Sequence, residues 1–319
     1  MLILLDSNVW RYIADADAAG ALQSAVAKTR HRIVVAPAVL YEAIRMRDTR
    51  LRQRLAEIMT RPAWHRLMPD AYSECEELRS EVQRLRPEWL RERPDLGWYR
   101  RIRSDWKKAN GGFWSRARHK PDIEHEYIGA LDGETIERAR ANARRQRQGI
   151  SDKNRPTLGK PLNTVMGRPP EPEVGWDGEA VEAWRLHAWS FMTSSLGEEG
   201  SAHHDWISGA VDLRLALFGA ANWTRFWFYD VDAPHLPRMW LRWSMEFMQS
   251  FHKVTDGTPV DAQIASYATD VDLIVSADTR FIAMCERCRR EAPFKVAEAI
   301  AVGGGEAGVE ELFDLVRAR

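Results

Sequence analysis

The chain has 319 residues, of which 45% are hydrophobic and 29% charged, with equal numbers of basic and acidic side chains. This composition is ordinary for a soluble globular protein of two domains or one enlarged domain, and zero net charge gives no overall argument for nucleic-acid binding. Three cysteines cannot form a disulfide framework in so long a chain, and no apolar stretch approaches the roughly 18 residues of a membrane span. We therefore expect a cytoplasmic protein without membrane contact.

The first 87 residues alternate between predicted strands and helices. Leu2–Leu5 and Arg32–Pro37 contain short apolar runs, as expected for strands buried on both faces of a parallel sheet. Pro37 is suited to the first turn of the following helix. The other predicted elements here are a helix over Asp15–Thr29, a weaker strand over Ala63–Pro69 and a helix over Ala71–Leu85.

The C-terminal part resumes this pattern. Its predicted elements are a helix over Thr258–Asp270, a strand over Asp272–Ser276, a helix over Asp278–Arg290, a strand over Phe294–Ile300 and a terminal helix after the glycines 303–305. Strands and helices that alternate at such short spacings predict an α/β fold. We expect a three-layer α/β/α architecture around a mainly parallel sheet of about five strands.

The pattern changes between these two parts. Residues 88–251 contain arginine-rich segments, a Pro/Gly/Asn-rich interruption at Asn154–Gly178 and most of the 14 tryptophans. Glu179–Leu196 and Pro237–Val254 are predicted helices. The sequence therefore predicts a discontinuous α/β domain, 1–87 with 252–319, interrupted by a mainly α-helical inserted subdomain, 88–251.

Charge is segregated along the inserted region. Glu81–Lys160 contains 20 Lys and Arg against 12 Asp and Glu, whereas Pro161–Ala210 contains 2 against 8. Such segregation favours a basic face that contacts phosphates, although a solvated helical surface paired with an acidic one is an equal alternative. The candidate RNA-binding residues are Arg100, Arg101, Arg103, Lys107, Lys108, Arg144 and Arg145.

Four acidic residues follow predicted strands or lie near the starts of adjoining helices. Asp6 ends the first strand, Glu42 lies in the second turn after the second strand, Asp261 opens a late helix and Asp278 follows the next strand. Taken singly, Asp6 and Asp278 are helix caps, Asp261 is a capping-box acid and Glu42 is a solvated helix position. Taken together, carboxylates at the carboxyl edge of a parallel sheet favour Mg²⁺ or Mn²⁺.

At these acids the sequence resembles the PIN-domain nucleases. The segments "LLDSNVW", "APAVLYEAIR", "PVDAQIASYA" and "DLIVSADTRF" look like the four successive signatures of that family, and they contain Asp6, Glu42, Asp261 and Asp278. The resemblance covers roughly residues 1–87 and 252–319. It departs from the family's compact members by the long insertion between the second and third acids.

The resemblance implies a metal-dependent endoribonuclease, in which a metal-activated water held by the carboxylate cluster hydrolyses RNA phosphodiester bonds. The four acids would be metal ligands, direct or through water, and Asn8 would orient Asp6 or a bound water. Many compact PIN proteins are toxins, so an antitoxin or other regulatory protein is an expected partner, as is a second copy of the chain in a homodimer. The insertion would supply RNA grip, substrate choice or a lid.

Two alternatives remain open. Related folds cut branched DNA with the same carboxylates, so a DNA-directed nuclease is one alternative, and a catalytically silent PIN-like module that binds a protein partner is the other. A haloacid-dehalogenase phosphatase is disfavoured, because that family needs an Asp where this chain has Asn8.

Other motifs carry less weight. Cys285 and Cys288 form a lone CxxC pair without the further ligands of a zinc site, and the adjacent His203 and His204 point apart on a helix. No glycine-rich nucleotide loop is present. The tryptophan pairs at helical spacing, such as Trp240 with Trp243, favour the core of the inserted subdomain over RNA stacking.

Overall fold

A five-stranded, wholly parallel sheet lies at the centre of the fold. The computed structural model describes residues 1–127, 159–251 and 258–318. The strand order is β3-β2-β1-β6-β7, and β1 places Ile3 between Ile33 and Leu273 of its two neighbours. The strands are β1 (Leu2–Leu5), β2 (Arg32–Val35), β3 (His65–Arg66), β6 (Leu273–Ser276) and β7 (Glu298–Ala301).

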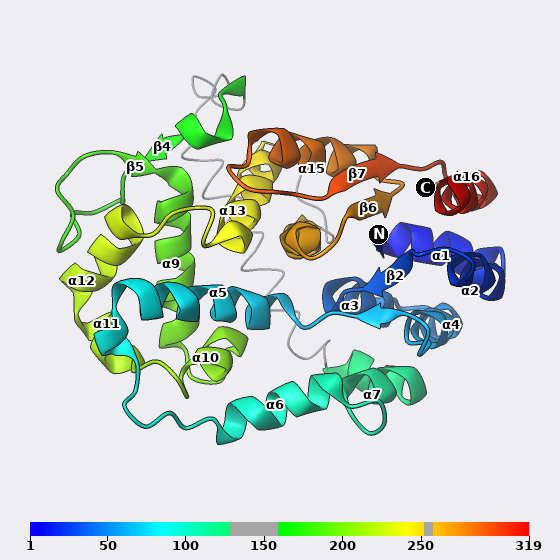
Figure 1. The fold of residues 1–319 in the computed structure, drawn as a ribbon, viewed down its shortest axis with the longest axis horizontal. Helices are drawn as coiled ribbons and strands as arrows, with labels where there is room; N and C mark the ends of the chain where they lie inside the picture. The colour runs from blue at the N-terminus through cyan, green and yellow to red at the C-terminus, as the bar shows by residue number, and fades with distance from the viewer. Residues whose placement is uncertain (128–158, 252–257, 319) are drawn as a thin grey trace.

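Helices cover both faces of this sheet. In Figure 1, α1, α2, α4 and α16 lie to the right of the strands, and α3, α14 and α15 lie to their left. The expected layered α/β architecture is therefore present. The bounds are α1 (Ser7–Asp15), α2 (Ala19–Ala27), α3 (Pro37–Arg45), α4 (Thr49–Met59), α14 (Thr258–Ser266), α15 (Thr279–Glu291) and α16 (Gly305–Ala318).

Some predicted elements differ from those in the structure. The helix expected over Asp15–Thr29 is interrupted, because Asp17 adopts a φ of 51° between α1 and α2. The strand expected over Phe294–Ile300 begins later, at Glu298, where β7 starts to pair with β6. Phe294 instead packs its ring against Trp240, 5.6 Å away. The first difference is thus a local backbone feature, whereas the second involves a contact between distant elements.

Helices of the 88–251 region pack against the left layer, with α13 beside α14 and α15 (Figure 1). Buried apolar side chains of this region and of the sheet belong to one continuous hydrophobic core. Helix α5 (Asp70–Leu85) precedes this region. The α-helices described within it are α6 (Gly97–Lys107), α7 (Phe113–His119), α9 (Ala183–Gly197), α10 (Ala202–Ile207), α11 (Leu213–Phe218), α12 (Ala220–Arg225) and α13 (Pro237–Ser250). Two short strands, β4 (Met166–Gly167) and β5 (Val181–Glu182), pair antiparallel.

Most tryptophans of this region lie in that core, as predicted, whereas Trp98 is exposed. Trp223 and Trp227 are buried with ring centroids 5.6 Å apart, and Trp240 and Trp243 are buried 6.1 Å apart. Both pairs have the edge-to-face geometry favoured by aromatic rings. These four rings therefore stabilise the helical region and are not available to stack on a nucleic acid.

Over the described ranges, no helix combines the length and apolarity needed to cross a membrane.

Candidate carboxylate site

Asp6 is the residue at which β1 ends and α1 begins, and it is only 7% exposed. Its Oδ1 accepts a hydrogen bond from the backbone N–H of Ser7 at 2.6 Å, so Asp6 is a helix cap, as its position predicts. Its Oδ2 accepts from Asn8 Nδ2 at 2.8 Å. Burial raises the pKa of Asp6, and these hydrogen bonds oppose that rise.

Ser276 joins the ends of the two central strands. Its hydroxyl donates to Asp6 Oδ2 at 2.5 Å, and it accepts from the backbone N–H of Asp278 and from Asn8 Nδ2, each at 3.0 Å. Ser276 was missed by the sequence reasoning, although its position at the end of β6, two residues before Asp278, was a usable signal. The side chain is fully buried, so these bonds are shielded from water.

Asn8 lies between the ends of β1 and β6, where its side-chain amide contacts both strand ends. Besides contacting Asp6 and Ser276, its Oδ1 accepts from the backbone N–H of Ala277 at 3.0 Å. Both the Nδ2 and the Oδ1 atoms of this amide therefore form hydrogen bonds that connect the end of β1 with the end of β6. This fixes the orientation of the amide, because only Nδ2 can donate to Asp6.

Asp278 caps α15, as predicted, by accepting from the backbone N–H groups of Arg280 and Phe281 at 2.8 and 3.0 Å. Its side chain is exposed, and its negative charge raises the pKa of the buried Asp6. The two acids that follow the central strands are therefore close enough to interact electrostatically.

Glu42 is half-buried on α3, so it is less solvated than its alternative interpretation as a surface helix position implies. Burial and the charge of Asp6 raise the pKa of Glu42 to about 7, against opposing effects from Ser7 and Arg45. Pro37 lies in the first turn of this helix, as predicted, and Glu42 in the second turn is close enough to Asp6 at the end of β1 to interact with its charge.

Asp261 lies in the first turn of α14, where its Oδ2 accepts from Gln249 Nε2 at 3.0 Å. Burial raises the pKa of Asp261 to about 8, and the charges of Glu42, Asp6 and Asp278 add to this rise. Gln249 opposes it. Gln249 belongs to α13 of the helical region, and no local sequence signal indicated this contact.

The fold thus brings all four predicted acids together as electrostatic neighbours at the carboxyl edge of the sheet. They do not form a finished coordination shell: within the part of the chain that is described, no three His, Cys, Asp or Glu side chains are arranged to hold one ion. Oxygen-only ligands suit a hard cation such as Mg²⁺ or Mn²⁺, whose charge would counter both the burial that chiefly raises these pKa values and the repulsion that adds to it.

The predicted basic residues divide into three groups. Arg100, Arg101, Lys107 and Lys108 are exposed on or beside α6. Arg103 is half-buried, and a hydrogen bond to Tyr72 raises its pKa, so this guanidinium has a structural partner inside the protein. Arg144 and Arg145 lie outside the described residues.

The motifs set aside on sequence grounds have internal roles. Cys285 and Cys288 are buried free thiols whose pKa values are raised by burial. His203 is buried and contacts Glu74 at 2.7 Å, whereas His204 is half-buried and 3.8 Å from Asp205. The two histidines therefore point to different partners, as expected.

No protein-family model, curated protein or solved structure matches this chain significantly.

Proposed function

We propose that this chain is an Mg²⁺- or Mn²⁺-dependent endoribonuclease with a PIN-like α/β domain. The observation that carries the proposal is the gathering of four acids at one sheet edge, where burial and then the charges of Glu42, Asp6 and Asp278 raise the pKa of Asp261. Strongly raised carboxyl pKa values are typical of functional sites, and burial of several acids together destabilises a protein unless cations or protons neutralise them.

The four carboxylates would hold the cation directly or through water. When bound, the cation would activate water and stabilise the negative charge that develops on the phosphate during in-line displacement. Among the four candidate metal ligands Asp6 is the most firmly oriented, because its carboxylate accepts hydrogen bonds from Ser7, Asn8 and Ser276. Such hydrogen-bonded support of a ligand tunes both its geometry and its affinity for metal.

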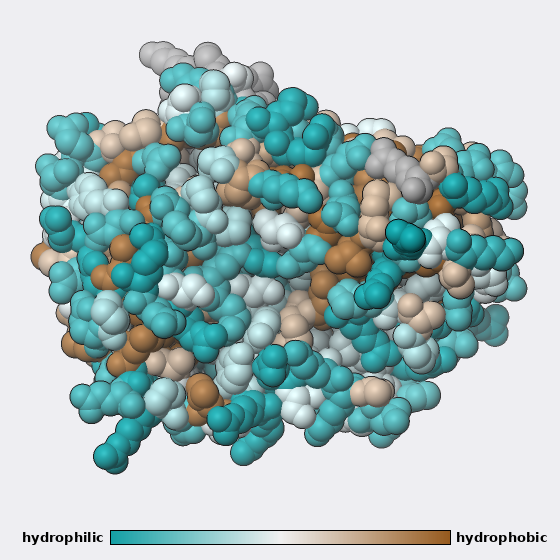
Figure 2. Space-filling model, in the orientation of Figure 1, coloured by the Kyte–Doolittle hydropathy of each residue, from teal (hydrophilic) through white to brown (hydrophobic). Residues whose placement is uncertain are grey.

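The solvent-exposed face of α6 carries basic side chains, which supports the proposal of a polyanionic substrate. Arg100, Arg101, Lys107 and Lys108 lie on this face or just beyond its end, and the described residues offer them no ion-pair partner. The helix's one acid, Asp105, is engaged by Arg116 at 2.8 and 3.0 Å. In Figure 2 the strip over α6, along the bottom of the molecule, is largely hydrophilic.

An aromatic ring borders this basic face. Trp98 is 48% exposed, and the guanidinium of Arg101 lies 5.2 Å from its ring centroid. An exposed indole beside cations provides a surface on which an unpaired base can stack. This favours single-stranded RNA over a duplex as the bound form.

A second candidate function is a catalytically silent PIN-like module that binds a protein partner. The lack of a finished coordination shell among the described residues favours it. Binding of Mn²⁺ discriminates between the two functions: titration of the metal-free protein by calorimetry should give saturable uptake with proton release if the carboxylates are ligands. A silent module should give neither.

The proposal is tested by incubating the full-length protein with end-labelled single-stranded RNA, and with DNA of the same sequence, in Mn²⁺, Mg²⁺ or EDTA. We expect metal-dependent RNA cleavage that Asp6→Asn abolishes without unfolding the protein, since the substitution removes one of several repelling charges. Full activity of Asp6→Asn would overturn the mechanism, and cleavage of DNA alone would establish the DNA-directed alternative.

A further inference from the structure

Helix α13 has a stripe of buried polar side chains that point at acids on other elements. Arg238, Arg242 and Gln249 are each less than 10% exposed. Their spacings of four and seven residues place them on one side of the helix. Each of them contacts at least one carboxylate outside α13, so this side of the helix is matched to its neighbours by polar contacts as well as by packing.

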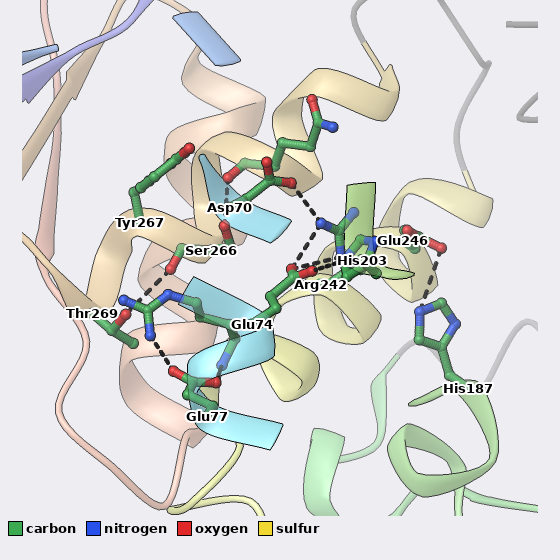
Figure 3. Close-up of polar contacts among 12 residues, drawn as sticks. Asp70, Glu74, Glu77, His187, His203, Arg242, Glu246, Ser266, Tyr267 and Thr269 are labelled. Carbon is green, nitrogen blue, oxygen red and sulfur yellow. Dashed lines mark hydrogen bonds and ion pairs between the residues drawn. The ribbon is translucent and has the colours of Figure 1, made fainter. Parts of the chain in front are cut away.

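Arg242 fixes the middle of α13 against α5. Its guanidinium donates to Asp70 Oδ2 at 2.8 Å and to Glu74 Oε1 at 2.7 and 2.9 Å. Glu74 is fully buried, and its second oxygen contacts His203 at 2.7 Å (Figure 3). The positive charge of Arg242 holds the pKa of Glu74 at about 2, so the carboxylate stays ionised.

Arg238 fixes the start of the same helix. It forms ion pairs with Glu77 on α5 and with Asp270, which follows α14 in the chain. Separating such buried pairs leaves uncompensated charge in the interior, which is costly. Movement of α13 along α5 is therefore resisted at two successive turns, and the far end of α13 is held in place.

Gln249 lies at that far end, where its amide N–H reaches Asp261 Oδ2 at 3.0 Å. A glutamine is suited to this position because it donates a hydrogen bond without placing a cation beside the carboxylates. Its side chain is only 6% exposed, so the bond is protected from competition with water. The contact orients Asp261, the candidate ligand on α14, which is the α-helix that comes before β6 in the chain.

We propose that Gln249 is a positioning residue for Asp261, so that helix α13 of the 88–251 region completes the carboxylate site of the α/β domain. This inference rests on the proposed metal-dependent function. It assigns the long insertion a part in forming the site itself, in addition to any role in holding RNA. It also implies that the α/β part without α13 would hold a cation less tightly.

The test compares Mn²⁺ binding by the full-length protein and three variants, measured by isothermal titration calorimetry. Gln249→Met keeps the volume and loses the donor, Gln249→Ala loses both, and Ser244→Ala is a matched control. Ser244 is a fully buried polar residue of α13, and its hydroxyl, within the described part of the chain, bonds to the carbonyl of Trp240 in the same helix and to no other element. Thermal unfolding in EDTA verifies that each variant is folded.

We expect Gln249→Met and Gln249→Ala to weaken Mn²⁺ binding about tenfold or more, the effect typical of losing a hydrogen-bond partner of a metal ligand. Ser244→Ala should bind as the wild type does. Unchanged binding by Gln249→Met, with or without a loss in Gln249→Ala, would overturn the inference by reducing Gln249 to a packing residue. Failure of the wild type to bind Mn²⁺ would instead overturn the proposed function on which the inference rests.

Discussion

The Ser276 hydroxyl lies 2.5 Å from Asp6 Oδ2, and this contact joins residues 270 positions apart in the chain. It links the carboxyl ends of β6 and β1, which are adjacent in the sheet. Because Ser276 also accepts from the backbone N–H of Asp278, one hydroxyl positions two of the four candidate ligands.

Ser276→Ala should therefore lower both stability and cleavage. Loss of the hydroxyl removes one of the two side-chain donors to Asp6 Oδ2 and removes the acceptor of the Asp278 backbone N–H, which costs about 1–3 kcal/mol of unfolding free energy. It also raises the pKa of Asp6 further, since this bond now lowers it. Urea denaturation and RNA cleavage measure the two effects. Ser266→Ala is the control, because Ser266 is equally buried and its hydroxyl, among the described residues, bonds to the carbonyl of Gln263 alone. An equal effect on cleavage in both variants would contradict the special role of Ser276.

The metal-free protein should lose stability as pH rises. Glu42 and Asp261 have pKa values raised to about 7 and about 8, so the folded state retains protons that the unfolded chain has already released. The free energy of unfolding therefore decreases as the pH rises from about 4.5 to about 8. Calorimetric melting in EDTA at several pH values measures this slope.

Asp261→Asn should flatten that decline, because the variant lacks the group with the most strongly raised of these two pKa values. Added Mn²⁺ should stabilise the wild type more at pH 8 than at pH 5, since deprotonated carboxylates bind the ion. A slope that is identical in wild type and Asp261→Asn would show that Asp261 ionises normally in the fold.

The α6 face should contribute to RNA affinity and its salt dependence. Arg100→Ala/Arg101→Ala should reduce the salt slope for single-stranded RNA by about 1.4, the expectation for two lost phosphate contacts. Fluorescence anisotropy measures the affinity in EDTA with Asp6→Asn as the background, which separates binding from cleavage. An unchanged slope would exclude this face as the RNA contact.

Trp98→Ala should weaken RNA binding by about 1–3 kcal/mol if one base stacks on the indole. Phe218→Ala is the matched control, because Phe218 is an aromatic side chain on α11 that is 83% exposed. Equal affinity of the Trp98→Ala variant and the wild type in the anisotropy assay would exclude stacking at this position.

Arg242→Met should destabilise the protein by about 3–5 kcal/mol, because Glu74 would remain as a buried charge that has lost its main partner. Arg317→Met removes an exposed arginine, 3.3 Å from Asp314, and should change stability by less than about 1 kcal/mol. Urea denaturation of both variants makes the comparison, and a small loss in Arg242→Met would show that Glu74 is neutralised in another way.

Much of the α/β framework was predictable because its signals are local. The apolar run Leu2–Leu5, the proline that opens α3 and the cap at Asp278 each act within a few residues. The strand-and-helix alternation then places residues that follow neighbouring strands at one edge. This is why the sequence predicts the four acids as neighbours.

The sequence by itself thus determined the parallel framework and the acids at its carboxyl edge. Only the tertiary structure decided which groups support those acids, which arginines face the solvent and how the helices of the 88–251 region pack against the helices beside the sheet. Gln249, Ser276 and the Tyr72 contact of Arg103 depend on helices and strands that pack across long stretches of chain. Local propensities act over a few residues, whereas these contacts exist only after the shared hydrophobic core has formed.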